Sequence, residues 1–369
     1  MKSNVFSLAL ALLMPVSVMA QQTDIVSLFP ENEVVPMLLS ARASTPRYGQ
    51  TTVDKPLTIL HCTDMHGSKD NLARIVDFAA AYGEYVDEVV HSGDGVFCYW
   101  DDENIFETVP GARKILNTIG NHDCWKGHLV WAQTEKPYDA SEQDAFEKFF
   151  IGSTKGKRIV DEWGVTLSDN PYGCYYHKDY PESKVRLVVL DCMHYTPSQN
   201  KWLIRTLDQA REKGYAVVGV THYPSSSGLM PIESGFTSFR REIPASDTTR
   251  VQYESMSEAA FNSVDGFIDA GGKFVCWLSG HTHSDYMGTV KGHENQLQVI
   301  LDKSGDMDTY MREDRTKGTR NQDAFNLTTV NPSRGLLTIY RIGCRRGADM
   351  RSKELFVYDY IHRRVVLSE

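Results

Sequence analysis

The chain has 369 residues, of which 41% are hydrophobic, and its formal net charge at pH 7 is −9. This length and composition are typical of globular proteins with a sizeable core, built as one large domain or two ordinary ones. Nucleic-acid polymers are usually bound by a basic surface, so the acidic chain favours small or polar substrates. The seven cysteines include no C-x-x-C pair, which excludes a zinc-finger protein and predicts no particular disulfide.

Residues 1–20 have the pattern of a secretory signal peptide. Lys2 precedes an apolar run from Val5 to Met14, and small residues ending at Ala20 precede Gln21. This pattern predicts cleavage and export to the periplasm or the medium. The apolar run is short for a membrane span, and no cysteine lies near the cleavage point for a lipid anchor. We therefore expect a released protein without a membrane anchor.

Two further regions are predicted after the signal peptide. Residues 21–55 are interrupted by prolines and are predicted to form an N-terminal arm packed on the domain. Residues 56–369 are predicted to form that domain, including C-terminal strands that belong to a second sheet. A separate C-terminal domain is the alternative, but fewer than about 90 residues would give it a weak core. The C-terminal strands are expected at 297–301, 335–342 and 355–359.

The first motif is Asp64-Met65-His66, which follows a short apolar run from Leu57 to Cys62. The run predicts a strand, and side chains two residues apart on an extended segment project to the same side. Ligands bind at the carboxyl ends of strands in open α/β sheets. A carboxylate and an imidazole at this point predict a pair of metal ligands.

Similar motifs follow at regular spacing. A second apolar run ends at Gly93-Asp94, and a third ends at Gly120-Asn121-His122-Asp123. The steps from Asp64 to Asp94 and from Asp94 to His122 are 30 and 28 residues, the size of strand-helix-strand units, which predicts neighbouring parallel strands.

The second half of the chain adds two more strand ends with histidines. The buried run Ala216–Val220 ends at Thr221-His222, and Phe274–Leu278 ends at Gly280-His281-Thr282-His283. A hairpin is expected before them, and the segments 124–169 and 223–255 are expected to shape the cleft. Apolar residues at helical spacing predict helices at 72–79, 203–210 and 260–268, with a shorter one near 141–150.

The assembled order D-x-H, G-D, G-N-H-D, T-H and G-H-x-H resembles the calcineurin-like metallophosphoesterase family, and the resemblance runs from Leu57 to Ser284. With the alternation of strand and helix patterns, it implies an α/β fold, a two-sheet αββα sandwich with helices on the outer faces. One departure concerns the segment Gly95–Cys98. It lacks the acidic or tyrosine residue that many members carry after G-D, which argues against purple acid phosphatases.

Carboxylate, carboxamide and imidazole donors without thiolate suit divalent Mn, Fe or Zn. Two such ions generate hydroxide and bind phosphoryl oxygens. The resemblance implies that Asp94 bridges them. It further implies that one ion is held by Asp64, His66 and His283, and the other by Asn121, His222 and His281.

The resemblance gives His122 a different task, because in the family it faces the leaving oxygen without binding metal. It is expected to act as general acid, with Asp123 orienting its ring. The remaining histidines are interpreted as ordinary packing or surface residues, although His61 and His91 lie near enough in sequence to support the ligands.

These features predict an exported, metal-dependent phosphoesterase. It would hydrolyse phosphate mono- or diesters of a small substrate with a bridging hydroxide on two ions and His122 as general acid. A nuclease of the same fold and a secreted binding module without catalysis are the alternatives. The acidic charge argues against the nuclease, and the complete ligand set argues against the binding module. The oligomeric state is left open.

Overall fold

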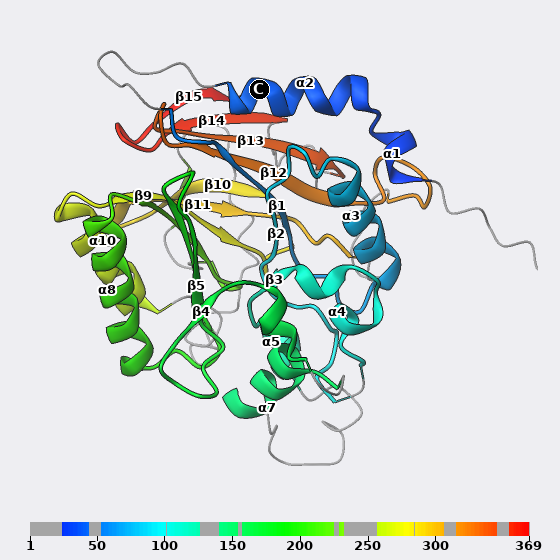
Figure 1. The fold of residues 1–369 in the computed structure, drawn as a ribbon, viewed down its shortest axis with the longest axis horizontal. Coiled ribbons are helices and arrows are strands. Elements are labelled where there is room, and N and C mark those ends of the chain that lie inside the picture. Colours follow the sequence, from blue (N-terminus) through cyan, green and yellow to red (C-terminus); the bar gives the residue numbers. More distant parts are fainter. Residues whose placement is uncertain are drawn as a thin grey trace, which may run out of the picture.

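The computed structural model describes residues 24–43, 53–100, 102–125, 140–153, 157–224, 229–231, 257–283, 285–305, 315–344 and 354–368. The predicted signal peptide and large parts of the loops 124–169 and 223–255 lie outside these ranges. The described chain forms two β sheets packed against each other, with helices outside them (Figure 1). The predicted two-sheet α/β sandwich is confirmed.

The seven-stranded sheet has the order β15-β14-β13-β12-β1-β2-β3. Its strands are β1 (Leu57–Cys62), β2 (Glu88–His91), β3 (Leu116–Asn117), β12 (Ala324–Asn331), β13 (Leu336–Gly343), β14 (Leu355–Asp359) and β15 (Arg364–Ser368). β2 pairs in parallel with both β1 and β3. The expectation of neighbouring parallel strands before the first three motifs is therefore correct, and their carboxyl ends meet at one edge.

The eight-stranded sheet has the order β4-β5-β6-β7-β9-β11-β10-β8. Its strands are β4 (Thr166–Leu167), β5 (Tyr176–Tyr180), β6 (Val185–Val189), β7 (Ala216–Val220), β8 (Leu229–Pro231), β9 (Lys273–Ser279), β10 (Tyr286–Val290) and β11 (His293–Ile300). β6, β7, β9 and β11 are parallel. The ends of β7 and β9, which carry the histidine motifs, are therefore neighbours.

The helices vary from single turns to sixteen residues. They are α1 (Ile25–Leu28), α2 (Glu31–Arg42), α3 (Lys69–Ala81), α4 (Ile105–Thr108), α5 (Asn121–Cys124), α7 (Glu142–Phe146), α8 (Pro197–Glu212) and α10 (Glu258–Asp269). Short turns of other helical types are η1 (Ala112–Lys114), η2 (Glu147–Ile151) and η3 (Ile159–Glu162). Within the described ranges, no helix is long and apolar enough to span a membrane.

The longer helices are amphipathic, and they cover opposite sides of the sandwich (Figure 1). On α3, the buried Phe78 packs on Phe325 of β12, with 4.8 Å between ring centroids. α8 and α10 form a second core with the outer face of the eight-stranded sheet, in which Leu207 and Val264 surround Trp277. All three predicted long helices are confirmed.

The C-terminal strands are divided between the two sheets, and this corrects their expected placement in a single second sheet. β11 joins the eight-stranded sheet, whereas β12 to β15 extend the seven-stranded sheet beside β1. No strand is predicted at β12, because the polar residues Asn326, Thr328 and Thr329 interrupt its apolar pattern. Its eight residues are nevertheless all buried, and its Thr329 hydroxyl lies 3.0 Å from that of Thr58 on β1.

The N-terminal region packs on the seven-stranded sheet through α2. Val34 and Leu38 on this helix are fully buried, and α2 contacts β12. At its end, Arg42 donates to Asp87 across 2.6 Å. Residues 24–43 therefore pack on β12 and reach the start of β2, and Arg42 also donates to Thr58 on β1.

Candidate metal centre

The site residues gather where five strands end. Asp64 and His66 follow β1, Asp94 follows β2, and Asn121 and His122 open α5 directly after β3. His222 follows β7, and His281 and His283 follow β9. Backbone hydrogen bonds join these ends in pairs: His66 N donates to Asp94 O at 3.0 Å, and Gly280 N donates to His222 O at 3.2 Å. Between the two sheets, the His281 backbone N donates to Asp64 Oδ2 at 3.0 Å, so the motifs of both sheets meet.

The backbone at the site is strained. Seven described residues other than glycine have a positive φ, and five of them are predicted ligands. A left-handed conformation costs a residue with a side chain of order 1–3 kcal/mol and persists only where the surroundings enforce it. Such a concentration of strain is typical of a functional site. The five are Asp64, His66, Asp94, His281 and His283, with φ from 46° to 68°.

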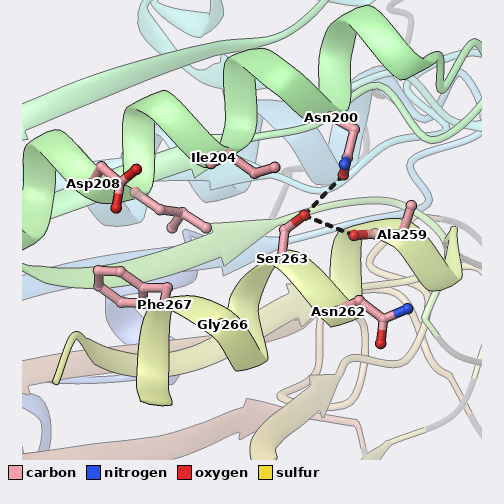
Figure 2. A pocket seen from close by; sticks show the side chains of 9 residues that line it. Asn200, Ile204, Asp208, Ala259, Asn262, Ser263, Gly266 and Phe267 are labelled. Carbon is pink, nitrogen blue, oxygen red and sulfur yellow. Dashed lines mark hydrogen bonds between the residues drawn. The ribbon is translucent and has the colours of Figure 1, made fainter. Parts of the chain in front are cut away.

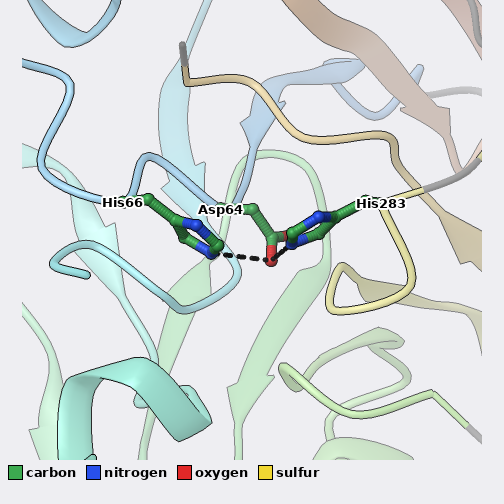
Figure 3. Close-up of side chains that lie close together, drawn as sticks. All are labelled: Asp64, His66 and His283. Atoms are coloured by element: carbon green, nitrogen blue, oxygen red, sulfur yellow. Dashed lines mark hydrogen bonds and ion pairs between the residues drawn. The ribbon is translucent and has the colours of Figure 1, made fainter. Parts of the chain in front are cut away.

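The first cluster consists of Asp64, His66 and His283 (Figure 3). The Nε2 atoms of His283 and His66 lie 3.1 Å and 3.7 Å from Oδ1 of Asp64. The other carboxylate oxygen of Asp64 accepts hydrogen bonds from the Thr63 hydroxyl at 2.7 Å and the His281 backbone N at 3.0 Å. The Asp64 side chain is fully buried, so one oxygen is fixed and the other faces two imidazoles.

Asp94 joins this cluster to the second one. Its Oδ2 lies 3.3 Å from Nε2 of His66 and 3.1 Å from Nε2 of His222. Donor atoms of Asp94, His222 and His281 fall within 4.8 Å of one another, and Asn121 Oδ1 lies 3.0 Å from His222 Nε2. The structure thus brings all seven predicted ligand positions together, with Asp94 in the middle.

The charges of the cluster are balanced by protons on histidines. Burial opposes ionisation of Asp94, but His222 outweighs it and holds the carboxyl pKa well below its usual range. Burial likewise opposes protonation of His222, yet Asp94 raises its pKa to about 9. Burial and the charge of His222 together lower the pKa of His281 to about 3. The protonated imidazole of His222 therefore lies beside the Asp94 carboxylate.

The donor set fits two divalent ions. Ions bind ionised carboxylates and neutral imidazoles, and they displace protons from such groups. Here two buried carboxylates face five imidazoles, including that of His122, in overlapping groups of donors that share His66 and Asp94. Asn121 adds an uncharged oxygen. With no thiolate among these donors, the set suits Mn, Fe or Zn.

His122 lies beside this cluster, with its ring centroid 4.4 Å from that of His66. Its backbone N donates to Asp94 Oδ1 at 2.8 Å, and its Nδ1 lies 2.6 Å from the Phe97 carbonyl. Because a carbonyl only accepts, Nδ1 carries a proton and Nε2 is the nitrogen left for chemistry. Burial lowers the pKa of His122.

The expected role of Asp123 is wrong. Its carboxylate accepts backbone N–H groups of Asp94 at 2.8 Å, Val96 at 3.1 Å and Gly120 at 2.9 Å. As the third residue of α5, Asp123 caps the helix start and turns away from the neighbouring imidazole. The Phe97 carbonyl orients the His122 ring instead. Asp123 therefore shapes the loop around Asp94.

Several supporting groups have no sequence motif. The Ser92 carbonyl lies 2.8 Å from Nδ1 of His222 and leaves its Nε2 facing Asp94. His61 and His91 are buried and contact Ser92 Oγ and Asn117 Oδ1, each at 2.8 Å. These contacts link β1 to the end of β2, and β2 to the end of β3. A backbone carbonyl such as that of Ser92 is not visible from residue types in a sequence.

Glycines in the motifs are required by space. A Cβ on Gly120 would lie 2.2 Å from Asp94 Oδ1, and one on Gly280 would lie 2.0 Å from Thr63 Oγ1 and 2.3 Å from Asp64 Oδ2. Contacts this short are far below van der Waals distance. The glycines before Asn121 and His281 therefore allow close approach to the carboxylates.

A groove on the outer surface contains none of these residues. It lies between α8 and α10, where Ser263 donates to Asn200 Oδ1 at 3.0 Å, and Ile204 and Phe267 provide its apolar lining (Figure 2). The candidate site is at the strand ends and not in this groove.

With this fold and these strand-end motifs, the chain belongs to the calcineurin-like phosphoesterase family, whose model matches residues 57–285. Among solved structures, a dimetal phosphatase from Danio rerio is 12% identical, covers 78% of this chain and 96% of its own, and has a TM-score of 0.47. GAP50, the anchor in the inner membrane complex of Plasmodium, is 13% identical, with 81% and 88% covered and a TM-score of 0.42. The comparison with curated proteins gave no match. The assignment therefore rests on the family model.

Proposed function

We propose that this protein is an exported phosphoesterase that uses two divalent transition-metal ions to hydrolyse phosphate mono- or diesters of small substrates. The observation that carries the proposal is the meeting of three overlapping donor groups at Asp94 and His66. The strained backbone of five of these residues supports it.

Each ion would have its own set of ligands. Bound ions would lower the pKa of water to provide a nucleophile at neutral pH and would stabilise charge on the phosphoryl oxygens. Asp94 would serve both ions, because its Oδ2 faces an imidazole of each cluster. One set is Asp64, His66 and His283, and the other is Asn121, His222 and His281.

His122 would donate a proton to the leaving oxygen. The Phe97 carbonyl holds the Nδ1 proton, so the proton that is transferred comes from Nε2 of the doubly protonated ring. Rings of Phe97 and Trp125 lie 5.0 Å and 5.1 Å from the His122 ring. Burial by such neighbours lowers the pKa of His122, so the protonated ring is a stronger acid toward the leaving oxygen, and a smaller fraction of it is protonated at neutral pH.

The substrate and the location of the protein follow from weaker signals. The acidic net charge of −9 favours a small phosphorylated substrate over a nucleic-acid polymer. The apolar N-terminal segment supports export with cleavage before Gln21. N-terminal sequencing of protein recovered from the culture medium or the periplasm of a bacterial host tests this part, and an intact Lys2 on the recovered chain would refute it.

Metal content and substrate profile test the catalytic proposal. The purified mature chain, stripped with a chelator and reconstituted with Mn, Fe or Zn, is expected to bind two ions and to hydrolyse members of a panel of phosphomonoesters, phosphodiesters and pyrophosphates. Hydrolysis restricted to nucleic acid would favour the nuclease. Two bound ions without hydrolysis would favour the binding module, and one ion or none would refute the two-metal centre.

A further inference from the structure

A buried ion pair connects the last ligand motif to the seven-stranded sheet. Nε of Arg341 on β13 lies 2.9 Å from Oδ1 of Asp285, and both side chains are at most 2% exposed. Asp285 stands two residues after His283 and directly before β10 of the eight-stranded sheet. The pair therefore links the two sheets beside the site. The guanidinium also donates to the carbonyls of Ile342 and Cys344, which fixes its orientation.

The same carboxylate holds a second segment, Asp302–Gly305. Oδ1 of Asp285 accepts the backbone N–H of Asp302 at 3.0 Å, and the Asp302 carboxylate pairs with the buried Arg315 at 3.1 Å. Arg315 also donates to the carbonyls of Lys303 and Gly305. Two arginines thus fix this segment from both sides.

The segment Asp302–Gly305 lies directly against the first ligand motif. Ser304 N donates to Thr63 O at 2.9 Å, and Gly305 N donates to Asp64 O at 3.2 Å. A Cβ on Gly305 would lie 2.2 Å from the Met65 carbonyl oxygen. The backbone that carries Asp64 therefore rests on a segment whose position depends on Asp285.

We propose that Arg341 and Asp285 are positioning residues for the ion that Asp64, His66 and His283 would hold, an inference that rests on the proposed function. They hold the backbone after β9 and the backbone after β1 in one arrangement. All three ligands have a left-handed backbone conformation, which needs support from its surroundings. Both Arg341 and the segment Asp302–Gly305 lie beyond residues 57–285, the part that matches the family model.

Two of the other ion's ligands, Asn121 and His222, have different supports, whereas His281 shares the loop after β9 with His283. His222 contacts the Ser92 carbonyl, Asn121 and Asp94, all of which belong to the β2, β3 and β7 ends. A change at Arg341 is therefore expected to weaken binding of the first ion much more than binding of the second.

Arg341→Met and Arg341→Lys test the proposal through metal content. The wild-type chain, dialysed against graded free Zn²⁺ or Mn²⁺, is expected to hold two ions. Arg341→Met is expected to hold one, with affinity for the other weakened about 10- to 100-fold. Arg341→Lys keeps the charge but not the planar fork and is expected to fall between them.

Arg186→Met is the matched control. Arg186 is equally buried, and its Nε pairs with Asp179 at 2.6 Å between β6 and β5, outside the network at the site. This variant is expected to lose thermal stability and still bind two ions with wild-type affinity. An equal loss of metal affinity in both variants would mean that Arg341 acts only through general stability, which overturns the proposal.

Gly305→Ala approaches the same site from the opposite side, because the added methyl group would press on Met65 O. This substitution is expected to weaken binding of the same ion. The positioning role would be overturned if folded Arg341→Met bound two ions with unchanged affinity. If Arg341→Met does not fold, the same result in both Arg341→Lys and Gly305→Ala would overturn it. A wild-type chain that binds no ion would instead overturn the proposed function and, with it, this inference.

Discussion

At the scale of single residues, His122 and the ligands beside it are expected to fail in different ways. Loss of a ligand costs an ion, whereas loss of a general acid costs rate alone, typically 10²- to 10⁴-fold. His122→Ala is therefore expected to retain two ions and to lose rate steeply on alkyl phosphate esters. On nitrophenyl esters, whose leaving group departs without a proton, the loss is expected to be much smaller.

Elemental analysis and kinetics on paired alkyl and nitrophenyl substrates check this prediction. The exposed His362, which pairs with Asp359 in its own turn, provides a control in His362→Ala with unchanged rates. An equal loss on both substrate types would exclude proton donation as the main role. Loss of metal would place His122 among the ligands, since its donor atom lies within 4.8 Å of those of His66 and Asp94.

His194 gives a separate prediction about stability and pH. Burial opposes its charge, but Asp191, 2.9 Å from Nδ1, outweighs burial and raises the pKa of His194 from 6.5 to about 9. Below pH 6.5 both the folded and the unfolded state hold the proton, and the stabilisation is complete. It is lost as pH rises from 6.5 to 9, by about 3 kcal/mol at most.

His194→Gln is expected to remove most of this pH dependence, because glutamine does not titrate. The free energy of unfolding, measured with urea at pH 6 and pH 9, provides the comparison with wild type. An identical decrease between these pH values in both proteins would show that the stabilisation comes from other groups.

At the scale of secondary-structure elements, β1 depends on strands far along the chain. It lies between β2 and β12, and β12 contributes fully buried residues on both faces. Removal of residues 306–369 would turn the β12 side of β1 into an exposed apolar edge, a typical cause of aggregation. The truncated chain is expected to be insoluble.

Expression of the truncated and full-length chains in parallel, with measurement of the soluble fraction, checks this expectation. A soluble truncated chain that still binds two ions would show instead that β12 to β15 are an appendage to the catalytic fold.

At the scale of the whole molecule, the sequence predicted what depends on residue type at strand ends. Asp64, Asp94 and the motif histidines stand out because glycines and apolar runs precede them, and parallel pairing of β1, β2 and β3 brings their ends together. The αββα sandwich followed from the alternation of strand and helix patterns and from the family resemblance.

The features that could not be predicted depend on contacts between residues far apart in the sequence. β12 was missed because its threonines and asparagines are buried by cross-strand neighbours that no local pattern shows. Asp123 was misassigned because its sequence position beside His122 suggested a contact, whereas the helix start turns its carboxylate toward Gly120 N. The Arg341–Asp285 pair joins residues 56 positions apart, without a local motif at either end.

Metal binding is expected to stabilise the whole fold. The site holds two buried carboxylates together with the protonated His222, and ions that bind only the folded state stabilise it by mass action. At a free concentration of 100 times Kd, each site contributes about 2.7 kcal/mol. For a domain of this size, two such sites correspond to a rise in Tm of roughly ten degrees. Removal of the ions with a chelator is expected to reverse the rise.

Thermal unfolding of the stripped chain with and without Mn²⁺ or Zn²⁺ measures this shift. Asp94→Asn is the decisive comparison, because a carboxylate that faces both clusters serves both ions, whereas His283→Ala leaves the second cluster complete. The increase in Tm on adding metal is expected to be nearly absent in Asp94→Asn and about halved in His283→Ala. If Asp94→Asn showed the same increase as wild type, Asp94 would not lie between two ions, and the central feature of the proposed site would be refuted.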